Sequence, residues 1–339
     1  MRPPPVTALT RNLVISAKRC SRLLVALLLR CALGLGLSAA AAAAPSHGAA
    51  ETSTALQRQA IQALILRADA DSLATAAALS FRQATSPSAL ELAVSASELA
   101  PQSAVIGWLH LQLCVETPAC DFRDVATVLR WVDADNGASW LPILAAAYRD
   151  RDWLEVDRVI ADMAQTKRFD LYSNPLVVLL ADALYKARGD LPHGFAGSDA
   201  QRLDLAGGIV GEIEPPFATL LDSCRAAAVG SERREACLKL SRIMQRGDAT
   251  MAQMAGFGIE KHLVAPDSKE GRAMNERRHV VEWRAMMAAR ADSGVLPWLK
   301  NAQARKRLAQ MRAAPRQEDV YVAMLREHRI ALEPTEIHP

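Results

Sequence analysis

The residues best suited to chemistry are the four cysteines that lie beyond the leader-like segment 1–44: Cys114, Cys120, Cys224 and Cys237. The chain begins with a segment typical of an export signal, and an even number of cysteines in an exported protein predicts disulfide bonds. Four cysteines allow three connectivities. Because closing a short loop costs the least entropy, we expect Cys114 to pair with Cys120 and Cys224 with Cys237. The alternative, a zinc site, needs closely spaced ligands such as C-x2-C, and neither spacing matches it.

Other candidate metal ligands are too few for a site. His110 and Cys114 are four residues apart and would share one face of a helix, but a disulfide-bonded Cys114 is not a ligand and two ligands do not make a site. Glu276 and His279 match one Glu-x-x-His half of a di-iron bundle, which requires a second copy. The sequence has no second copy, so we expect neither a metal nor another cofactor.

The sequence contains none of the familiar catalytic motifs. It has no G-x-S-x-G nucleophile elbow and no H-E-x-x-H zinc motif. The glycine-rich run 207–211 lacks a preceding strand, so close helix packing is expected there rather than phosphate binding. A cell-envelope enzyme with a glutamate as general acid remains the alternative, but no surrounding sequence singles out one glutamate.

Residues 1–44 are typical of a signal peptide. Basic residues precede an apolar run that starts at Leu23 and ends in alanines at Ala44. The small residues before Pro45 predict cleavage close to this point. The alternative is an uncleaved inner-membrane anchor, because 23–44 approaches the ~20 residues that a span needs. Lipidation at Cys31 is not expected, because Arg30 stands where a small residue is required.

The distribution of charge argues against a nucleic-acid partner. Six of the 40 basic residues and none of the 37 acidic residues lie in 1–44, so the formal charge of +3 becomes slightly negative without this segment. The rest is uneven: residues 45–222 hold 13 basic and 23 acidic residues, whereas 223–339 hold 21 and 14. Such asymmetry favours attraction between the two halves or contact with an anionic surface.

Beyond the leader, the sequence predicts an all-α fold. Alanine, leucine, arginine and glutamate are frequent and no long β-branched alternation occurs. Apolar residues recur at helical spacing, and Pro, Gly and Asp-Asn-Gly separate the segments. The expected helices are 73–83, 88–99, 104–113, 122–133, 138–149, 153–166, 173–188, 199–211, 215–228, 232–246, 249–263, 270–291 and 316–329.

A weak internal repeat occupies residues 86–170. Trp108-Leu109 recurs as Trp140-Leu141, 32 residues later, and this period is typical of helical repeats. The segment 132–141, followed by Tyr148 and Trp153, resembles the junction and first helix of a tetratricopeptide repeat. Pro142 and Asp157 depart from that pattern. The overall layout also resembles exported α-helical proteins of Gram-negative bacteria to which no activity is assigned. These resemblances imply helical hairpins stacked as an α-solenoid.

Two groups of residues are candidates for binding. Stacked hairpins leave side chains free on a concave surface, and we expect Trp140, Tyr148 and Trp153 to contact a protein partner there. Arg305, Lys306 and Arg307 are the candidates for weak contact with an anionic membrane surface. An apolar face for this contact would come from Leu296, Trp298, Leu299 and Leu308.

The sequence thus predicts four regions. These are a signal peptide or anchor (1–44), a flexible entry to the first helix (45–70), tetratricopeptide-like repeats (71–198) and a C-terminal helical region (199–339). The expected function is that of a periplasmic scaffold or adaptor that binds another envelope protein. Inner-membrane anchoring facing the periplasm is the alternative location.

Overall fold

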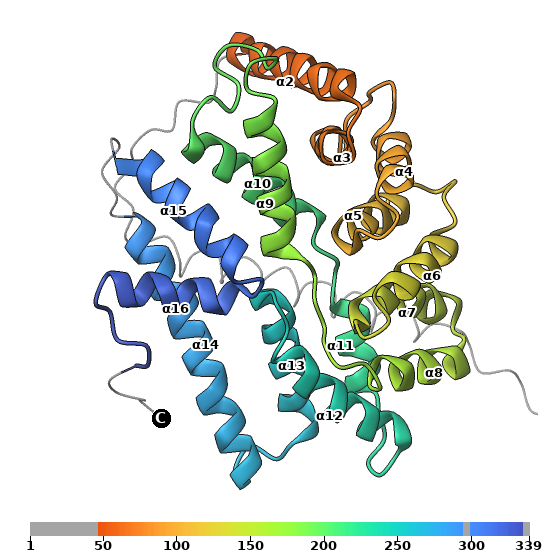
Figure 1. Ribbon diagram of the computed structural model, residues 1–339. Helices are drawn as coiled ribbons and strands as arrows, with labels where there is room; N and C mark the ends of the chain where they lie inside the picture. The colour runs from red at the N-terminus through yellow and green to blue at the C-terminus, as the bar shows by residue number, and fades with distance from the viewer. Residues whose placement is uncertain (1–46, 294–298, 335–339) are drawn as a thin grey trace, which may run out of the picture. The chain divides into compact units, whose positions relative to one another are not determined.

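The computed structural model describes residues 47–293 and 299–334, with side chains from Thr54 onward. By its internal contacts the chain divides into residues 1–52 and 53–339, and the fold described here is that of the second unit. The described residues form α-helices and one short 3₁₀-helix, without a β-strand (Figure 1). The all-α prediction is therefore confirmed. The predicted signal segment, 1–44, lies outside the described residues.

The first eight α-helices cover the N-terminal half of the described chain. They are α2 (His47–Arg67), α3 (Ala70–Leu79), α4 (Ala89–Leu99), α5 (Ala104–Val115), α6 (Phe122–Val132), α7 (Leu141–Asp150), α8 (Trp153–Met163) and α9 (Ser173–Lys186), with the 3₁₀-helix η1 (Gly137–Trp140) before α7.

Seven α-helices follow in the C-terminal half. They are α10 (Asp199–Ile213), α11 (Ala218–Arg225), α12 (Glu232–Met244), α13 (Thr250–Leu263), α14 (Lys269–Ser293), α15 (Lys300–Ala313) and α16 (Gln317–Glu327). No helix in the described part of the chain combines the length and apolar content needed to cross a membrane.

Local chemistry explains where many helices begin. The Asp69 carboxylate accepts the Ser72 N–H at 2.9 Å and caps α3. Capping boxes start two others: Ser88 with Glu91 at α4, and Ser198 with Gln201 at α10. Such caps satisfy N–H groups that have no partner within the helix.

Two helices were not expected from the sequence. The entry segment 45–70 was predicted to be flexible, but α2 occupies most of it, and Ile61 and Leu64 of α2 are fully buried. Helix α15 was missed because its apolar pattern is weak: Ala304, Arg307 and Leu308 are its buried residues. Packing of these few side chains, rather than amphipathic periodicity, stabilises both helices.

Consecutive helices pack on one another from α3 to α6, and α7 packs on α8. Helix α9 then returns to contact α3 and pairs with α10. In a solenoid each repeat touches only its neighbours, and the contact of α9 with α3 departs from that rule. The solenoid arrangement of residues 71–198 therefore remains a prediction.

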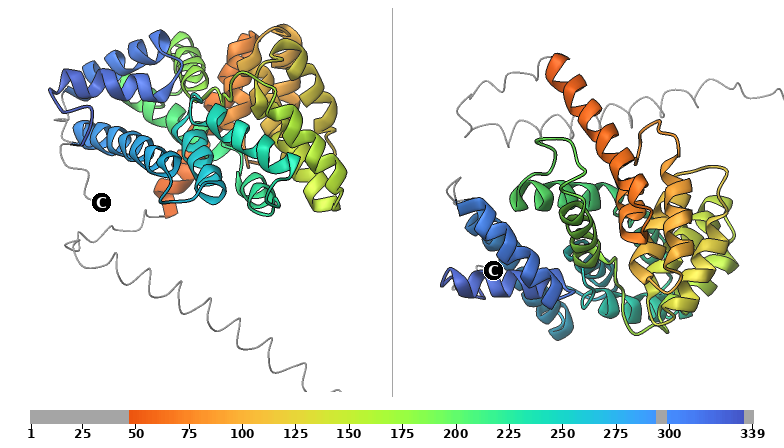
Figure 2. Two further views of the ribbon diagram at one scale, coloured as in Figure 1. Left: turned by 90° about the horizontal axis from the view of Figure 1, so that it is seen from below. Right: turned by 45° about the horizontal axis from the view of Figure 1, so that its top comes forward.

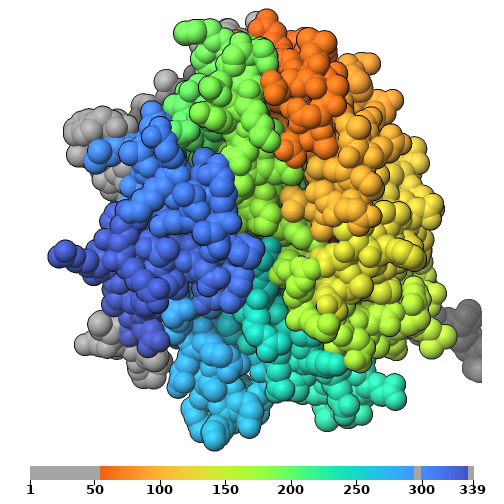
Figure 3. Space-filling view, viewed as in Figure 1, coloured from red at the N-terminus to blue at the C-terminus, as the bar shows by residue number. Residues whose placement is uncertain are grey.

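Helices α14, α15 and α16 lie on the side opposite α3–α8 (Figures 1 and 2), whereas α11 contacts α7. Helix α12 pairs with α13 and also contacts α8, and α14 packs on α13 and α16. Helix α15 lies across α9 and α10, and Figure 3 shows the α15 surface directly beside that of α9.

Helix α5 joins the two main hydrophobic clusters. Trp108 and Leu111 belong to the cluster formed with α7, α8, α12 and α13. Leu109 and Leu113 belong to the cluster formed with α3, α4, α9 and α10. A helix that is apolar all round is buried on all sides, and α5 fits this description.

The cysteines form the two local pairs that loop closure favours. Cys114, at the end of α5, is bonded to Cys120 with the Cα atoms 5.3 Å apart. Cys224 of α11 is bonded to Cys237 of α12 with a Cα separation of 5.7 Å. The second disulfide closes a helical hairpin inside the core, since both cysteines are at most 1% exposed.

Candidate functional site

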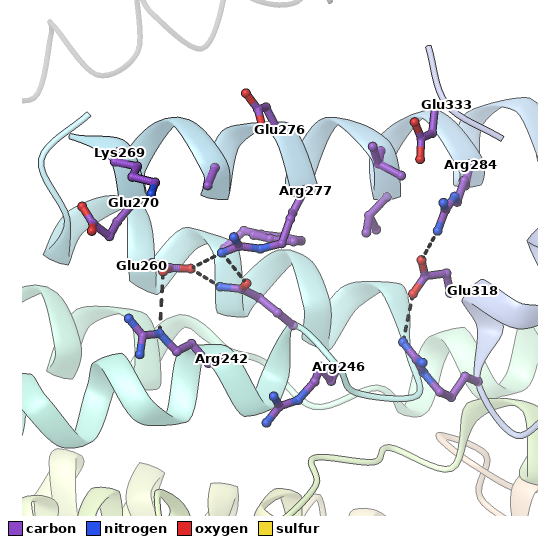
Figure 4. Close-up of a pocket in the computed structure, with 16 residues that line it drawn as sticks. Arg242, Arg246, Glu260, Lys269, Glu270, Glu276, Arg277, Arg284, Glu318 and Glu333 are labelled. Carbon is purple, nitrogen blue, oxygen red and sulfur yellow. Dashed lines mark hydrogen bonds and ion pairs between the residues drawn. The ribbon is translucent and has the colours of Figure 1, made fainter. Parts of the chain in front are cut away.

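A groove of about 930 Å³ lies between α12, α13 and α14, with residues 316, 318 and 333 at one end (Figure 4). Its floor is apolar and includes the buried side chains of Phe257 and Val281. Its walls carry arginine, lysine and glutamate side chains. A concave surface with an apolar floor and polar walls is typical of binding sites, so this groove is the candidate functional site.

Glu260 of α13 is the buried charge of the groove, with 2% of its surface exposed. Its carboxylate accepts hydrogen bonds from the Gln245 side-chain amide and from Arg277 at 3.3 Å, and Arg242 Nε lies 4.0 Å away (Figure 4). Donors from α12 and α14 thus converge on one carboxylate of α13. Because these partners come from different helices, Glu260 joins α12, α13 and α14.

A second carboxylate closes one end of the groove. Glu318 of α16 accepts from Arg284 of α14 at 2.5 Å and from Arg316 at 2.9 Å. The Arg284 side chain is 19% exposed and that of Arg316 is 37% exposed. This pair of contacts fixes the start of α16 against α14.

Five charged side chains of the groove form no ion pair with any described residue. Arg246 and Lys269 are positive, and Glu270, Glu276 and Glu333 are negative. All five are exposed. The walls therefore offer unpaired charges of both signs to an incoming molecule, above an apolar floor.

Two carboxyl groups with a raised pKa lie elsewhere. Burial, together with the charge of Asp170, raises the pKa of Asp248 to about 7. Asp248 is 3% exposed and accepts the Leu171 N–H at 2.7 Å. Burial also raises the pKa of Glu214, which lies 3.4 Å from the Ser173 hydroxyl. Both groups hold the segment that leads into α9, and neither lines the groove.

A buried polar network connects α6 to this same segment, and it was not found from the sequence. The Tyr172 hydroxyl donates to Asp133 and accepts from Asn136 Nδ2 at 3.1 Å. Burial and the hydrogen bond to Asp133 raise the pKa of Tyr172, which keeps the phenol protonated. Arg168 also pairs with Asp133. The turn 135–137 was predicted, but the sequence does not show that Asn136 is 1% exposed.

The three aromatic residues expected to bind a partner differ in their exposure. Trp140 is half-buried, with the guanidinium of Arg130 4.1 Å from its ring centroid. Tyr148 packs on the core and meets Trp153 edge-on at 5.6 Å. Only Trp153 is substantially exposed, at 48%. Trp131 of α6 is 88% exposed and was overlooked; its position opposite Leu129 in the helical pattern was the available signal.

The basic residues of α15 were expected to form a free cationic surface, but they pair with acidic residues. Arg305 pairs with Asp199 at 3.0 Å and Lys306 with Glu327 at 2.6 Å. Arg307 is 5% exposed and donates to Asp292, so it does not face an anionic surface. Of the proposed apolar face, Leu308 is buried and Leu299 exposed, while Leu296 and Trp298 lie outside the described residues. The sequence shows three adjacent basic residues, 305–307, but not which of them is buried; in α15 it is Arg307.

No group of three potential metal ligands occurs among the described residues. His110 Nδ1 lies 3.2 Å from the Ser97 hydroxyl, and its neighbour Cys114 is disulfide-bonded. Burial lowers the pKa of His110. This histidine is therefore a half-buried polar group with a hydrogen-bond partner.

Comparisons with known proteins do not assign a relative. No protein-family model matches the chain, and neither the curated proteins nor the solved structures gave a significant match. The likeness of residues 86–170 to a tetratricopeptide repeat thus remains a prediction from the sequence.

Proposed function

We propose that this protein is an exported adaptor of the cell envelope that holds an extended segment of another envelope protein in the groove between α12, α13 and α14. The observation that carries the proposal is the composition of the groove, in which an apolar floor lies between walls with unpaired charges of both signs. Periplasmic location is part of the proposal and is supported by the leader-like segment 1–44 and by two disulfides.

The charged side chains of the groove walls indicate what kind of segment the groove would bind. Arg246 and Lys269 would face acidic residues of the partner, and Glu270 and Glu276 would face basic ones. Complementary charges of this kind set specificity and association rate more than affinity. Apolar side chains of the partner would cover Phe257 and Val281 and supply the hydrophobic contribution. A segment with alternating charge and a few apolar residues satisfies both requirements.

Binding is better supported than catalysis. The one deeply buried carboxylate of the groove, Glu260, is engaged by Gln245, Arg277 and Arg242. A general acid needs a proton to donate and access to the substrate. Glu270 and Glu276 are exposed and form no ion pair with the described residues.

Site-specific photo-crosslinking in the cell tests the proposal. A photoreactive amino acid at Ala273, which lines the groove, should capture one envelope protein through one contiguous segment. The matched control is the same amino acid at Met286, an exposed position of the same helix outside the groove. Capture at both positions, or at neither, would contradict the proposed site.

Charge reversal provides the second test. Arg246→Glu and Lys269→Glu together should weaken capture at Ala273, because acidic residues of the partner would then be repelled. Reversal at Arg290, an exposed residue of α14 that does not line the groove, should leave capture unchanged. If the groove variant captures the partner as well as the wild type does, the charge-based recognition is wrong.

A further inference from the structure

The segment 331–334, which follows α16, contacts α14 at the end of the groove that Arg284 lines. Trp283 Nε1 donates to the Ala331 oxygen at 3.1 Å. Arg284 Nε donates to the Leu332 oxygen, also at 3.1 Å. Two consecutive residues of α14 thus bind two consecutive carbonyl groups of the chain's own backbone.

The next residue of the segment, Glu333, lines the groove itself (Figure 4). Its end of the groove has an excess of positive charge, because Arg284 and Arg316 share the single carboxylate of Glu318. Glu333 adds a second carboxylate there. It forms no ion pair with a described residue, but an exposed charge interacts over distances up to about 10 Å. The segment therefore complements this end of the groove in charge as well as in hydrogen bonding.

The segment 331–334 is held weakly. None of its four residues is buried, and Ala331 and Glu333 are exposed. Its hydrogen bonds with described residues are the two to α14, of which that from Trp283 lies at the surface. Few buried contacts and exposed hydrogen bonds are typical of parts that open without unfolding the rest of a protein.

The packing of α16 does not depend on this segment. The Ile330 N–H donates to the Leu325 oxygen at 2.8 Å and ends the chain's turn after α16. Arg284 Nη1 donates to Glu318 at the start of α16. Both bonds are made by residues outside 331–334, so they persist when the segment leaves.

We infer that the segment 331–334 is an internal occupant of the groove, which a partner displaces by presenting two backbone carbonyls to Trp283 and Arg284 and an acidic side chain in place of Glu333. The reason is that the Arg284 donor is partly buried. Leaving such a donor without an acceptor is unfavourable, and an incoming carbonyl restores the bond. The role of the segment as a competitor rests on the proposed function, whereas its own binding to α14 does not.

Tethering makes this occupant an effective competitor. A segment joined to its site by a short chain has an effective concentration on the order of millimolar. A molecule in solution at micromolar concentration therefore binds only the fraction of the protein in which the segment has left, and its apparent affinity falls by that fraction. Removing the segment should raise the affinity of the groove for a separate molecule of the same chemistry.

Binding of a synthetic peptide tests the inference without knowledge of the partner. The probe is a fluorescein-labelled peptide with the sequence of residues 329–339, followed by fluorescence anisotropy. A purified chain that ends at Ile330 should bind it saturably, and the purified full chain should bind it at least about tenfold more weakly. The same peptide with the change Glu333→Lys should bind the shortened chain about tenfold more weakly, because it adds positive charge at an end that already has an excess.

Two tryptophan variants of the shortened chain locate the binding. Trp283→Phe keeps an aromatic ring but removes the N–H that donates to Ala331, and the affinity for the peptide should fall about threefold or more. Trp131→Phe is the matched control, because Trp131 is an exposed residue of α6 outside the groove. This control should bind the peptide as the unsubstituted shortened chain does.

A full-length variant keeps the test independent of the truncation. Leu332→Gly leaves α16 and the rest of the chain complete but removes the half-buried side chain of the segment. It should bind the peptide more tightly than the full wild-type chain does. Circular dichroism should show the same helicity for all variants, and Leu332→Gly decides the outcome if the shortened chain is less helical.

Three results would overturn the inference. They are the absence of saturable peptide binding to both the shortened chain and Leu332→Gly, equal affinity of these chains and the full wild-type chain, and an equal effect of the two tryptophan substitutions. Equal binding of the two peptides would overturn the part assigned to Glu333.

Photo-crosslinking at Ala273 in the cell separates this inference from the proposed function. Stronger capture of the envelope partner by the shortened chain than by the full chain supports the competitor role. Unchanged capture would overturn that role while the groove remains the partner's site. Absence of capture by both chains would contradict the proposed function, and saturable peptide binding would then still support the segment as an occupant of the groove.

Discussion

The side chain of Asn136 forms two hydrogen bonds with the backbone of Asp170, 34 residues later in the chain. Its Nδ2 donates to the Asp170 oxygen at 2.9 Å, and its Oδ1 accepts the Asp170 N–H at 2.9 Å. The side-chain amide of Asn136 thereby donates to and accepts from the backbone of one residue, as a residue of an adjacent β-strand does. This contact fixes the loop between α8 and α9 against the start of η1.

Replacing Asn136 should destabilise the protein strongly. Asn136→Ala leaves the backbone groups of Asp170 and the N–H of Ala138 without this partner in a buried site, and we expect a loss of about 2–4 kcal/mol in the free energy of unfolding. Urea unfolding followed by circular dichroism measures the loss. Asn275→Ala, at a half-buried residue of α14, is the control and should change the free energy by less than about 1 kcal/mol.

The two disulfides should contribute unequally. The bond between Cys224 and Cys237 spans 13 residues and that between Cys114 and Cys120 spans six. The chain-entropy estimate gives about 3 kcal/mol for the longer loop and about 2 kcal/mol for the shorter one. Urea unfolding of the two double-alanine variants should show this order. Equal stability of the wild type and the Cys224→Ala/Cys237→Ala variant under oxidising conditions would show that this bond does not form in solution.

Glu260 and Glu276 should respond differently to the same substitution. Glu260→Gln removes a buried carboxylate from Arg277 and Arg242, and we expect a loss of about 2–3 kcal/mol. Glu276→Gln changes an exposed glutamate of the same groove without an ion pair, and we expect a change within about 0.5 kcal/mol. Thermal unfolding compares the two variants, and similar midpoints would contradict the role assigned to Glu260.

Asp248 should make stability depend on pH near neutrality. Its pKa is about 7 in the folded protein and 3.8 for a free side chain. Between these values the folded state binds the proton and the unfolded state does not, so the contribution of Asp248 to stability falls as pH rises toward 7. Asp248→Asn removes this dependence. The free energy of unfolding of the variant, relative to that of the wild type, should therefore increase from pH 5 to pH 8.

Urea titrations at several pH values between these limits measure the difference. The control is Asp204→Asn, at an exposed carboxyl group of α10. This variant should keep a constant offset from the wild type. A constant offset for Asp248→Asn as well would mean that Asp248 is ionised throughout this range.

Local patterns in the sequence were sufficient for most of the helices. The expected segment 122–133 corresponds to α6 at Phe122–Val132, and 232–246 to α12 at Glu232–Met244. Caps, turns and apolar periodicity act over a few residues and can be read directly. Helix α15 was missed because its buried face contains an arginine, and a buried arginine looks like surface charge in a sequence.

The candidate groove could not be found in this way. Glu260 and Arg277 are 17 residues apart and belong to different helices, and nothing near either residue indicates that they meet. For the same reason, the predicted surface position of Arg307 was wrong. Arg307 is buried, and its partner Asp292 is 15 residues away on α14. Trp140, which was expected on an open surface, is half-buried, whereas the overlooked Trp131 is 88% exposed.

The sequence by itself determined the helical class, the places where most helices start and stop, and the favoured pairing of cysteines, because these depend on neighbours within one or two turns or on the length of one loop. Only the tertiary structure decided which charges are buried, which aromatic rings are free and where cavities remain. These properties depend on how distant helices pack, and the packing follows from the combined burial of two hydrophobic clusters rather than from any single segment.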